Sequence, residues 1–120
     1  MEKVVASHPI NYIEFYVLDL SQAKKFFADA VGWKFTDYGD SYSGIQDGNG
    51  GEMGGITTEG YPRGSGGPLV VLLSQELEAS LESVKQAGGK ITTEIFEFPG
   101  GRRFHFEDPS GNEIAIWCHA

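Results

Sequence analysis

Residues 10–33 read INYIEFYVLDLSQAKKFFADAVGW, and this stretch decides the fold. Residues 10–18 are mostly β-branched and aromatic, which predicts a strand, and both of its faces are apolar enough to be covered. Asp19 then offers a capping oxygen to a helix with an apolar stripe, and Gly32 ends that helix in a left-handed turn. The stretch therefore predicts a doubly covered strand followed directly by an amphipathic helix.

The same order of elements recurs in the second half of the chain. The run Leu69–Leu73 predicts a buried strand, an apolar stripe of helical spacing covers 77–87, and Gly88-Gly89 ends the helix. Three short strand candidates follow each strand–helix pair, near 33–38, 42–47 and 53–58 in the first half and near 90–96, 102–107 and 113–118 in the second.

This pattern predicts one α+β domain over residues 1–120, built from two βαβββ repeats. Repeat one covers about 8–59, a glycine-containing linker about 60–67, and repeat two about 68–118. A small sheet with one helix cannot bury both of its faces by itself. We therefore expect the repeats to form a curved, cup-like mixed sheet with the helices outside.

The amino-acid composition argues against several classes of partner. The 120 residues include 9 Lys and Arg against 17 Asp and Glu, and a net charge of −8 argues against nucleic acid. No apolar run is long enough to cross a bilayer, so no membrane partner is expected. Cys118 is the only cysteine, which excludes a disulfide or a cysteine zinc site within one chain. With no apolar signal segment at the start, we expect a cytoplasmic location.

Two motifs resemble the vicinal-oxygen-chelate superfamily of glyoxalases, bleomycin-resistance proteins, fosfomycin-resistance enzymes and extradiol dioxygenases. The first is the strand followed by Asp19-Leu20 and a helix that contains Phe26-Phe27 and closes at Val31-Gly32-Trp33. The second is Phe106 to Asn112, whose Asp-Pro-x-Gly-Asn segment has the signature of a hairpin turn. The resemblance implies a glyoxalase/bleomycin-resistance/dioxygenase fold and a homodimer.

Members of this superfamily usually hold a divalent metal with His and Glu side chains inside the cup. The resemblance assigns three ligand positions to Tyr12, Leu69 and Ala115, and the fourth falls near Glu52. Leu and Ala cannot coordinate a metal, and a neutral Tyr is a poor ligand for Ni²⁺, Zn²⁺ or Mn²⁺. The sequence is therefore identified as a member without the usual metal ligands, and no cofactor is expected.

Strand alternation, counted from the ligand positions that the resemblance assigns, indicates which side chains share the cup, and the resemblance also implies that Arg103 and His105 are pocket residues. Glu14 and His105 are the candidates for acid–base chemistry, because a carboxyl beside an imidazole can exchange a proton with a substrate. Among apolar neighbours the ionised form of the Glu14 carboxyl is disfavoured, unless Arg103 or His105 pairs with it. The candidate ligand-binding residues are Tyr12, Tyr16, Leu69, Arg103, Ala115 and Trp117.

Four functions remain open at this stage. The first is a metal-free protein that binds a small organic molecule, and the acidic, aromatic cup suits a cationic or aromatic ligand. The second is a metal-independent isomerase or lyase that uses Glu14 and His105. The third is a metal-dependent glyoxalase-like lyase with atypical ligands drawn from Glu14, Glu113, Glu52 and His105. The fourth is a structural or regulatory partner. The glycine-rich segment 48–55 lacks the spacing of a phosphate-binding loop.

Overall fold

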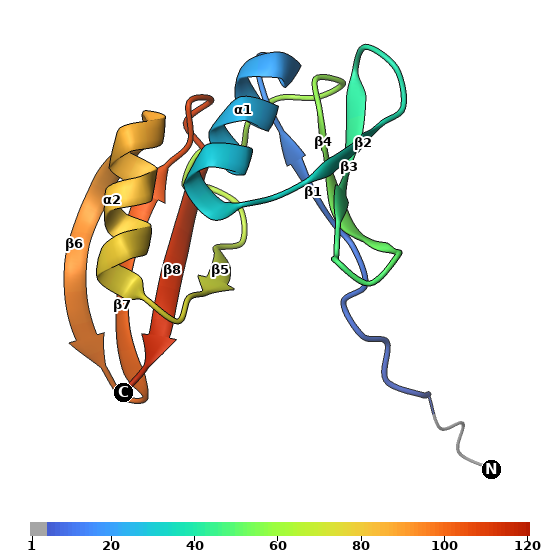
Figure 1. Ribbon diagram of the computed structural model, residues 1–120. Coiled ribbons are helices and arrows are strands. Elements are labelled where there is room, and N and C mark those ends of the chain that lie inside the picture. The colour runs from blue at the N-terminus through green and yellow to red at the C-terminus, as the bar shows by residue number, and fades with distance from the viewer. Residues whose placement is uncertain (1–4) are drawn as a thin grey trace.

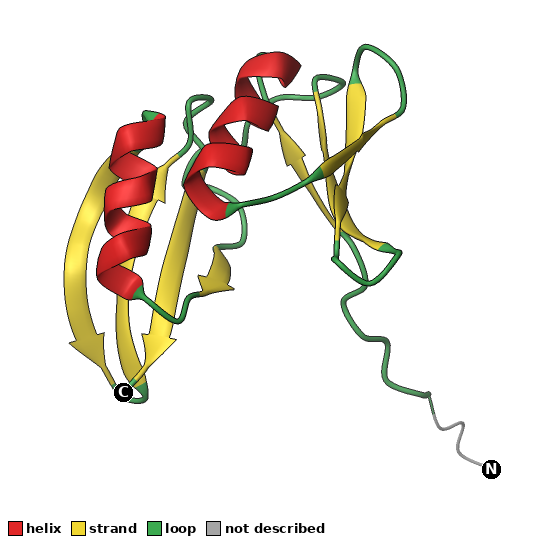
Figure 2. Ribbon diagram, in the orientation of Figure 1, coloured by secondary structure: helices red, strands yellow, loops and turns green. Residues whose placement is uncertain are grey.

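The computed structural model describes residues 5–120, and Figures 1 and 2 show two sheets with a pair of helices between them. The fold is α+β and consists of two βαβββ repeats, as predicted. The first repeat contains β1 (Ile13–Tyr16), α1 (Leu20–Val31), β2 (Phe35–Asp37), β3 (Tyr42–Gln46) and β4 (Glu52–Thr57). The second contains β5 (Val70–Leu73), α2 (Leu77–Ala87), β6 (Lys90–Phe98), β7 (Gly101–Glu107) and β8 (Glu113–His119).

The two sheets have the same topology. Their strand orders are β1-β4-β3-β2 and β5-β8-β7-β6. In each sheet the first strand pairs in parallel with the last strand of its repeat, and the other pairs are antiparallel. Strands β1 and β5 therefore lie at one edge of their sheets. In residues 5–120 neither helix is long and apolar enough to cross a membrane.

The helices begin and end as their sequences predict. The Asp19 carboxylate accepts a 2.8 Å hydrogen bond from the Gln22 N–H at the start of α1. Gly32 ends the helix with φ 73°, a left-handed conformation that costs a residue without Cβ little. Gly88 ends α2 with φ 101° in the same way.

One hydrophobic core joins the repeats through the helices. α1 and α2 pack side by side (Figure 1), and Phe26 of α1 lies 6.1 Å from Phe106 of β7, measured between ring centroids. Phe27 of α1 and Val84 of α2 are fully buried in the same cluster. Because burying one such side chain contributes about 1.5–3 kcal/mol, this core holds the repeats together as one unit.

The predicted turn at 108–112 connects β7 with β8 and also ties the second repeat to the first. The Asn112 side chain donates a 2.8 Å hydrogen bond to the Tyr16 carbonyl of β1 and accepts a 3.0 Å bond from the Arg63 N–H of the linker. Ser110 Oγ accepts a 2.9 Å bond from the Leu18 N–H. The Asp-Pro-x-Gly-Asn motif therefore fastens the end of β1 to the second sheet.

The expectation that β1 and β5 are covered on both faces is wrong for the single chain. Tyr12 is 37% exposed, Val71 40% and Leu73 56%. The helices cover only one face of each sheet, and no hydrogen-bonded strand pair joins the two sheets within residues 5–120. Each sheet therefore keeps an open face on the side away from the helices, and the side chains of the cup lie on these open faces.

Candidate functional site

The open face of the first sheet carries a connected set of phenols and carboxylates, which we call the tyrosine–glutamate network. The Tyr42 hydroxyl donates to Glu14 Oε2 at 2.7 Å and lies 2.7 Å from the Tyr12 hydroxyl. The Tyr12 hydroxyl is 3.3 Å from Glu52 Oε1, and Tyr38 donates to the other oxygen of Glu52. The network therefore crosses the sheet from β1 to the β2–β3 turn.

Two glycines in the middle of the sheet make room for this network. Gly44 of β3 pairs with Gly55 of β4. A Cβ at Gly55 would lie 2.2 Å from the Tyr42 hydroxyl oxygen, and one at Gly44 would lie 2.4 Å from the Glu52 carboxylate. A side chain at either position would displace the network. The Tyr42 ring and the Glu52 carboxylate therefore occupy the space that the two glycines leave free above the sheet.

The network is rich in acceptors and carries negative charge. Burial, followed by the hydrogen bonds with Tyr12 and Glu14, raises the pKa of the Tyr42 phenol well above its usual range. The hydrogen bond to Glu52 raises the pKa of Tyr38. Within residues 5–120 no Lys or Arg forms an ion pair with either carboxylate of the network. The phenols therefore remain proton donors, and the face can offset its negative charge by binding a cation.

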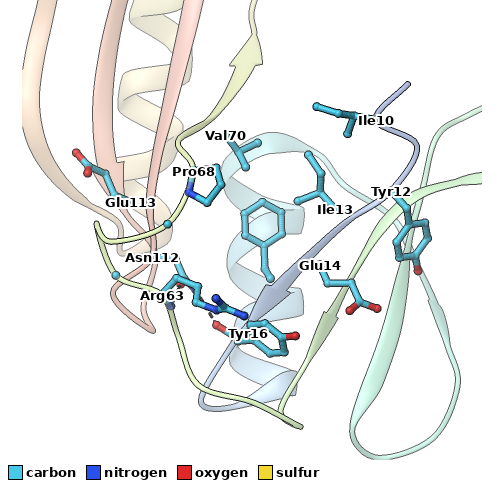
Figure 3. Close-up of a pocket in the computed structure, with 13 residues that line it drawn as sticks. Ile10, Tyr12, Ile13, Glu14, Tyr16, Arg63, Pro68, Val70, Asn112 and Glu113 are labelled. Atoms are coloured by element: carbon cyan, nitrogen blue, oxygen red, sulfur yellow. Dashed lines mark hydrogen bonds between the residues drawn. The ribbon is translucent and has the colours of Figure 1, made fainter. Parts of the chain in front are cut away.

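A cleft of about 420 Å³ lies beside the network, where the edge strand β1 faces the linker and the start of β5 (Figure 3). Tyr12, Glu14 and Tyr16 line one wall, and Arg63 lies over Tyr16 with its guanidinium carbon 4.9 Å from the ring centroid. Val70 adds an apolar surface on the opposite wall. The cleft can accept an apolar or aromatic group of a molecule that contacts Glu14.

The second sheet has an open face of different chemistry. Arg103 lies across from Trp117 in the β7–β8 pair, and His105 lies across from Ala115. His105 Nδ1 is 3.2 Å from the Glu113 carboxylate. Leu69 stands just before β5 and is partly exposed. This face offers a guanidinium, an imidazole and an indole.

The residues predicted for one cup are divided between the two sheets. Tyr12, Glu14 and Tyr16 belong to the first sheet, and Leu69, Arg103, His105, Ala115 and Trp117 belong to the second or its edge.

Neither Arg103 nor His105 pairs with Glu14 within residues 5–120. Glu14 is exposed and accepts its hydrogen bond from Tyr42, while His105 contacts Glu113. The physical reason is that the two residues stand on separate sheets.

Sequence reasoning missed Tyr38 and Tyr42 and left the register of Glu52 undecided. Alternation along one strand does not say which residues meet across strands, and glycine-rich strands specify their register weakly. Here a register shift beside Gln46 sets Glu52 opposite Gln46 and on the open face. The signal that was available is the pair of tyrosines at the adjoining ends of the strand candidates near 33–38 and 42–47.

The donor set does not fit the divalent metal that the resemblance implies. Leu69 and Ala115 offer no donor atom, and Tyr12 is already hydrogen-bonded to Tyr42. Glu14 and Glu52 each accept a phenol proton. Among residues 5–120 no group of three or more His, Cys, Asp or Glu side chains is placed to hold a metal ion.

Several solved structures share the fold of this chain at low sequence identity. A glyoxalase-related enzyme from Fulvimarina pelagi superposes with a TM-score of 0.79 at 17% identity, covering 94% of this chain and 89% of that one. Hypothetical protein SA1046 from S. aureus gives 0.73 at 18% identity, covering 97% and 95%. TnmS3, an antibiotic binding protein from Streptomyces sp. CB03234, gives 0.69 at 19% identity, covering 98% and 100%.

No curated protein matches the chain. The family model described as Glyoxalase/Bleomycin resistance protein/Dioxygenase superfamily matches residues 9–116, which is nearly the whole sequence. With its two βαβββ repeats, the chain belongs to the glyoxalase/bleomycin resistance protein/dioxygenase superfamily.

Proposed function

We propose that this protein binds a small organic cation without a metal. The observation that carries the proposal is the tyrosine–glutamate network on the open face of the first sheet. Two carboxylates with no Lys or Arg ion partner within residues 5–120 stand among three tyrosine rings. An ammonium group is bound by charge-assisted hydrogen bonds to carboxylates and by electrostatic attraction to the faces of aromatic rings.

Two further observations support a ligand of this charge. The chain has a net charge of −8, which raises the local concentration of cations near its surface. The cleft beside Glu14 is large enough for the apolar part of a small molecule. TnmS3, which has the same fold, is described as an antibiotic binding protein, so this fold serves ligand binding elsewhere.

We also propose that the protein is a homodimer in which the first sheet of one copy faces the second sheet of the other. Both open faces expose large aromatic or apolar side chains, including Tyr12 and Tyr38 at the first sheet and Val71 and Leu73 on the second. Such patches favour burial against another surface. In this arrangement each cup has one wall from each copy, and Glu14 of one copy shares a cup with His105 of the other.

Calorimetric titration with benzylamine and its neutral analogue benzyl alcohol tests cation binding. We expect benzylamine to bind about tenfold more tightly than benzyl alcohol, because a charge-assisted hydrogen bond is worth about 1.5–3 kcal/mol. Glu14→Gln and Glu52→Gln should each remove most of this preference. Glu82→Gln, on an exposed position of α2, is the matched control and should leave it unchanged. Equal binding of the two compounds would refute the proposal.

A second function is favoured by the contact between His105 and Glu113. A carboxylate that orients an imidazole is the arrangement of a general base, and His105 Nε2 has no partner within the described residues. A metal-independent isomerase or lyase would then use His105 with Glu113, and Glu14 would act from the facing wall. Deuterium exchange into pyruvate tests this function: a rate lost in His105→Asn supports it, and no exchange above background rejects it.

A further inference from the structure

We propose that Arg103 binds a carboxylate of the ligand, so that the molecule held in the cup is amphoteric. The proposal rests on the proposed function for the location of the ligand, since the tyrosine–glutamate network would take the amine. The carboxylate subsite itself lies entirely on the second sheet. It is therefore testable even if the cation site fails.

Arg103 is held in place by aromatic rings. Its guanidinium carbon lies 5.4 Å from the ring centroid of Phe96 and 5.4 Å from that of Phe98, both on β6. Trp117 stands opposite it on β8. Stacking against aromatic faces restricts the guanidinium plane while leaving its charge intact. Less rotamer freedom is then lost when an anion binds.

The positive charge of Arg103 has no ion-pair partner in the part of the chain that the structure describes. Within residues 5–120 it makes no ion pair, whereas the neighbouring Arg102 is paired with Glu78 of α2 on the helix side of the sheet. Nε of Arg103 is buried without a hydrogen-bond partner. The terminal nitrogens therefore form the fork that is open to a ligand, and such a fork matches the two oxygens of a carboxylate.

The surroundings of Arg103 strengthen such a contact. Trp117 is half-buried beside it, and the exposed side chains of Val71 and Leu73 continue the same open face toward the sheet edge. An apolar setting weakens competition from water, so a charge pair formed there is stronger than one at the bare surface. An aromatic ligand body would also stack on the indole of Trp117.

The two walls together specify the class of ligand. One wall presents the carboxylates of Glu14 and Glu52, and the other presents the guanidinium of Arg103. A molecule with an amine at one end, a carboxylate at the other and an apolar or aromatic body between them satisfies both.

Calorimetry with three matched probes tests this inference: 4-(aminomethyl)benzoate, benzylamine and benzoate. We expect wild-type protein to bind 4-(aminomethyl)benzoate about tenfold more tightly than benzylamine, the gain of one charge-assisted carboxylate contact. Arg103→Gln should abolish that gain, so that 4-(aminomethyl)benzoate binds no more tightly than benzylamine. Arg102→Gln is the matched control, since it removes the neighbouring guanidinium from the helix side, and the gain should persist.

Each outcome decides between the two proposals. If benzoate binds in an Arg103-dependent way and benzylamine does not bind, the carboxylate subsite stands and the proposed cation function falls. If wild type binds benzylamine and 4-(aminomethyl)benzoate equally, or Arg103→Gln keeps the preference, the carboxylate subsite is overturned. A loss of dimer in Arg103→Gln without any carboxylate preference in wild type would assign Arg103 to an ion pair between subunits instead. Circular dichroism of Arg103→Gln and of the conservative Arg103→Lys verifies that the fold of each variant is intact.

Discussion

At the scale of single residues, the Asn112 side chain connects three segments that are far apart in the chain. Its side chain donates to the Tyr16 carbonyl at 2.8 Å and to Asp108 Oδ2 at 3.0 Å, and accepts from the Arg63 N–H at 3.0 Å. Asn112 itself is only 5% exposed. One buried amide therefore joins the first strand, the linker and the last hairpin.

Asn112→Ala should lower the free energy of unfolding by about 3 kcal/mol, because it leaves buried polar groups without partners. Urea denaturation followed by circular dichroism measures the loss. Asn49→Ala is the control, because Asn49 lies in the exposed β3–β4 loop and should change stability by less than about 0.5 kcal/mol. Similar midpoints for the two variants would contradict the role given to Asn112.

The Tyr42 phenol should ionise at higher pH than an ordinary tyrosine. Its pKa is raised in the folded state, first by burial and then by its hydrogen bonds with Tyr12 and Glu14. The stability it contributes is therefore fully present below the unfolded pKa of about 10 and is lost as the pH rises above that value. Alkaline titration of the tyrosine absorbance should show a delayed component that Tyr42→Phe removes.

Tyr61→Phe provides the comparison for that titration. Tyr61 is 86% exposed and lies outside the tyrosine–glutamate network, so Tyr61→Phe should leave the delayed component in place. If Tyr42→Phe removes the same part of the curve as Tyr61→Phe, the tyrosine–glutamate network does not hold the Tyr42 proton.

At the scale of elements, β4 contains two neighbouring glycines that face opposite sides of the first sheet. Gly54 faces the helix side, where a Cβ would lie 2.2 Å from the Ile13 carbonyl oxygen of β1. Gly55 faces the open side, where a Cβ would lie 2.2 Å from the Tyr42 hydroxyl. Backbone cannot move away without breaking the β1–β4 pairing, whereas a tyrosine side chain can turn.

Gly54→Ala should therefore destabilise the protein by about 3 kcal/mol, and Gly55→Ala by less. Gly55→Ala should keep the fold and weaken benzylamine binding about tenfold, because it displaces Tyr42 from Glu14. Thermal unfolding and calorimetry on both variants measure the two effects. Benzylamine binding at the wild-type level in Gly55→Ala would show that the network is not the binding surface.

At the scale of the whole molecule, the largest feature left uncovered is the pair of open sheet faces. The helices bury one face of each sheet and hold the repeats together, so the remaining apolar side chains have no cover within the described chain. The proposed dimer covers them by placing unlike faces together. An acidic face and a face with an unpaired guanidinium are also complementary in charge.

Val71→Asp should convert the dimer into a monomer with an unchanged circular dichroism spectrum. A carboxylate on a face that the proposed dimer buries would be desolvated without a partner. Light scattering during size-exclusion chromatography measures the mass. Gln86→Asp adds the same charge on the exposed surface of α2, and this variant should keep the molar mass of a dimer. A monomeric wild type, or a dimeric Val71→Asp, would contradict the proposed assembly.

Much of the fold follows from local signals in the sequence. Asp19 and Gly32 bound the first helix because capping and left-handed turns depend only on neighbouring backbone groups. The hairpin at 108–112 forms for the same reason. Alternation also predicts that Arg102 and Arg103 point to opposite faces, and Arg102 does meet Glu78 on the helix side.

The sequence by itself therefore determined the two βαβββ repeats, the ends of the helices and the absence of donor atoms at Leu69 and Ala115. Only the tertiary structure decided that Glu14 meets Tyr42, that Glu52 shares their face, and that Arg103 stands on a different sheet without an ion partner within residues 5–120. Local signals act over a few neighbouring residues. Strand register and the packing of one repeat on the other depend on contacts between segments far apart in the chain, which no local pattern specifies.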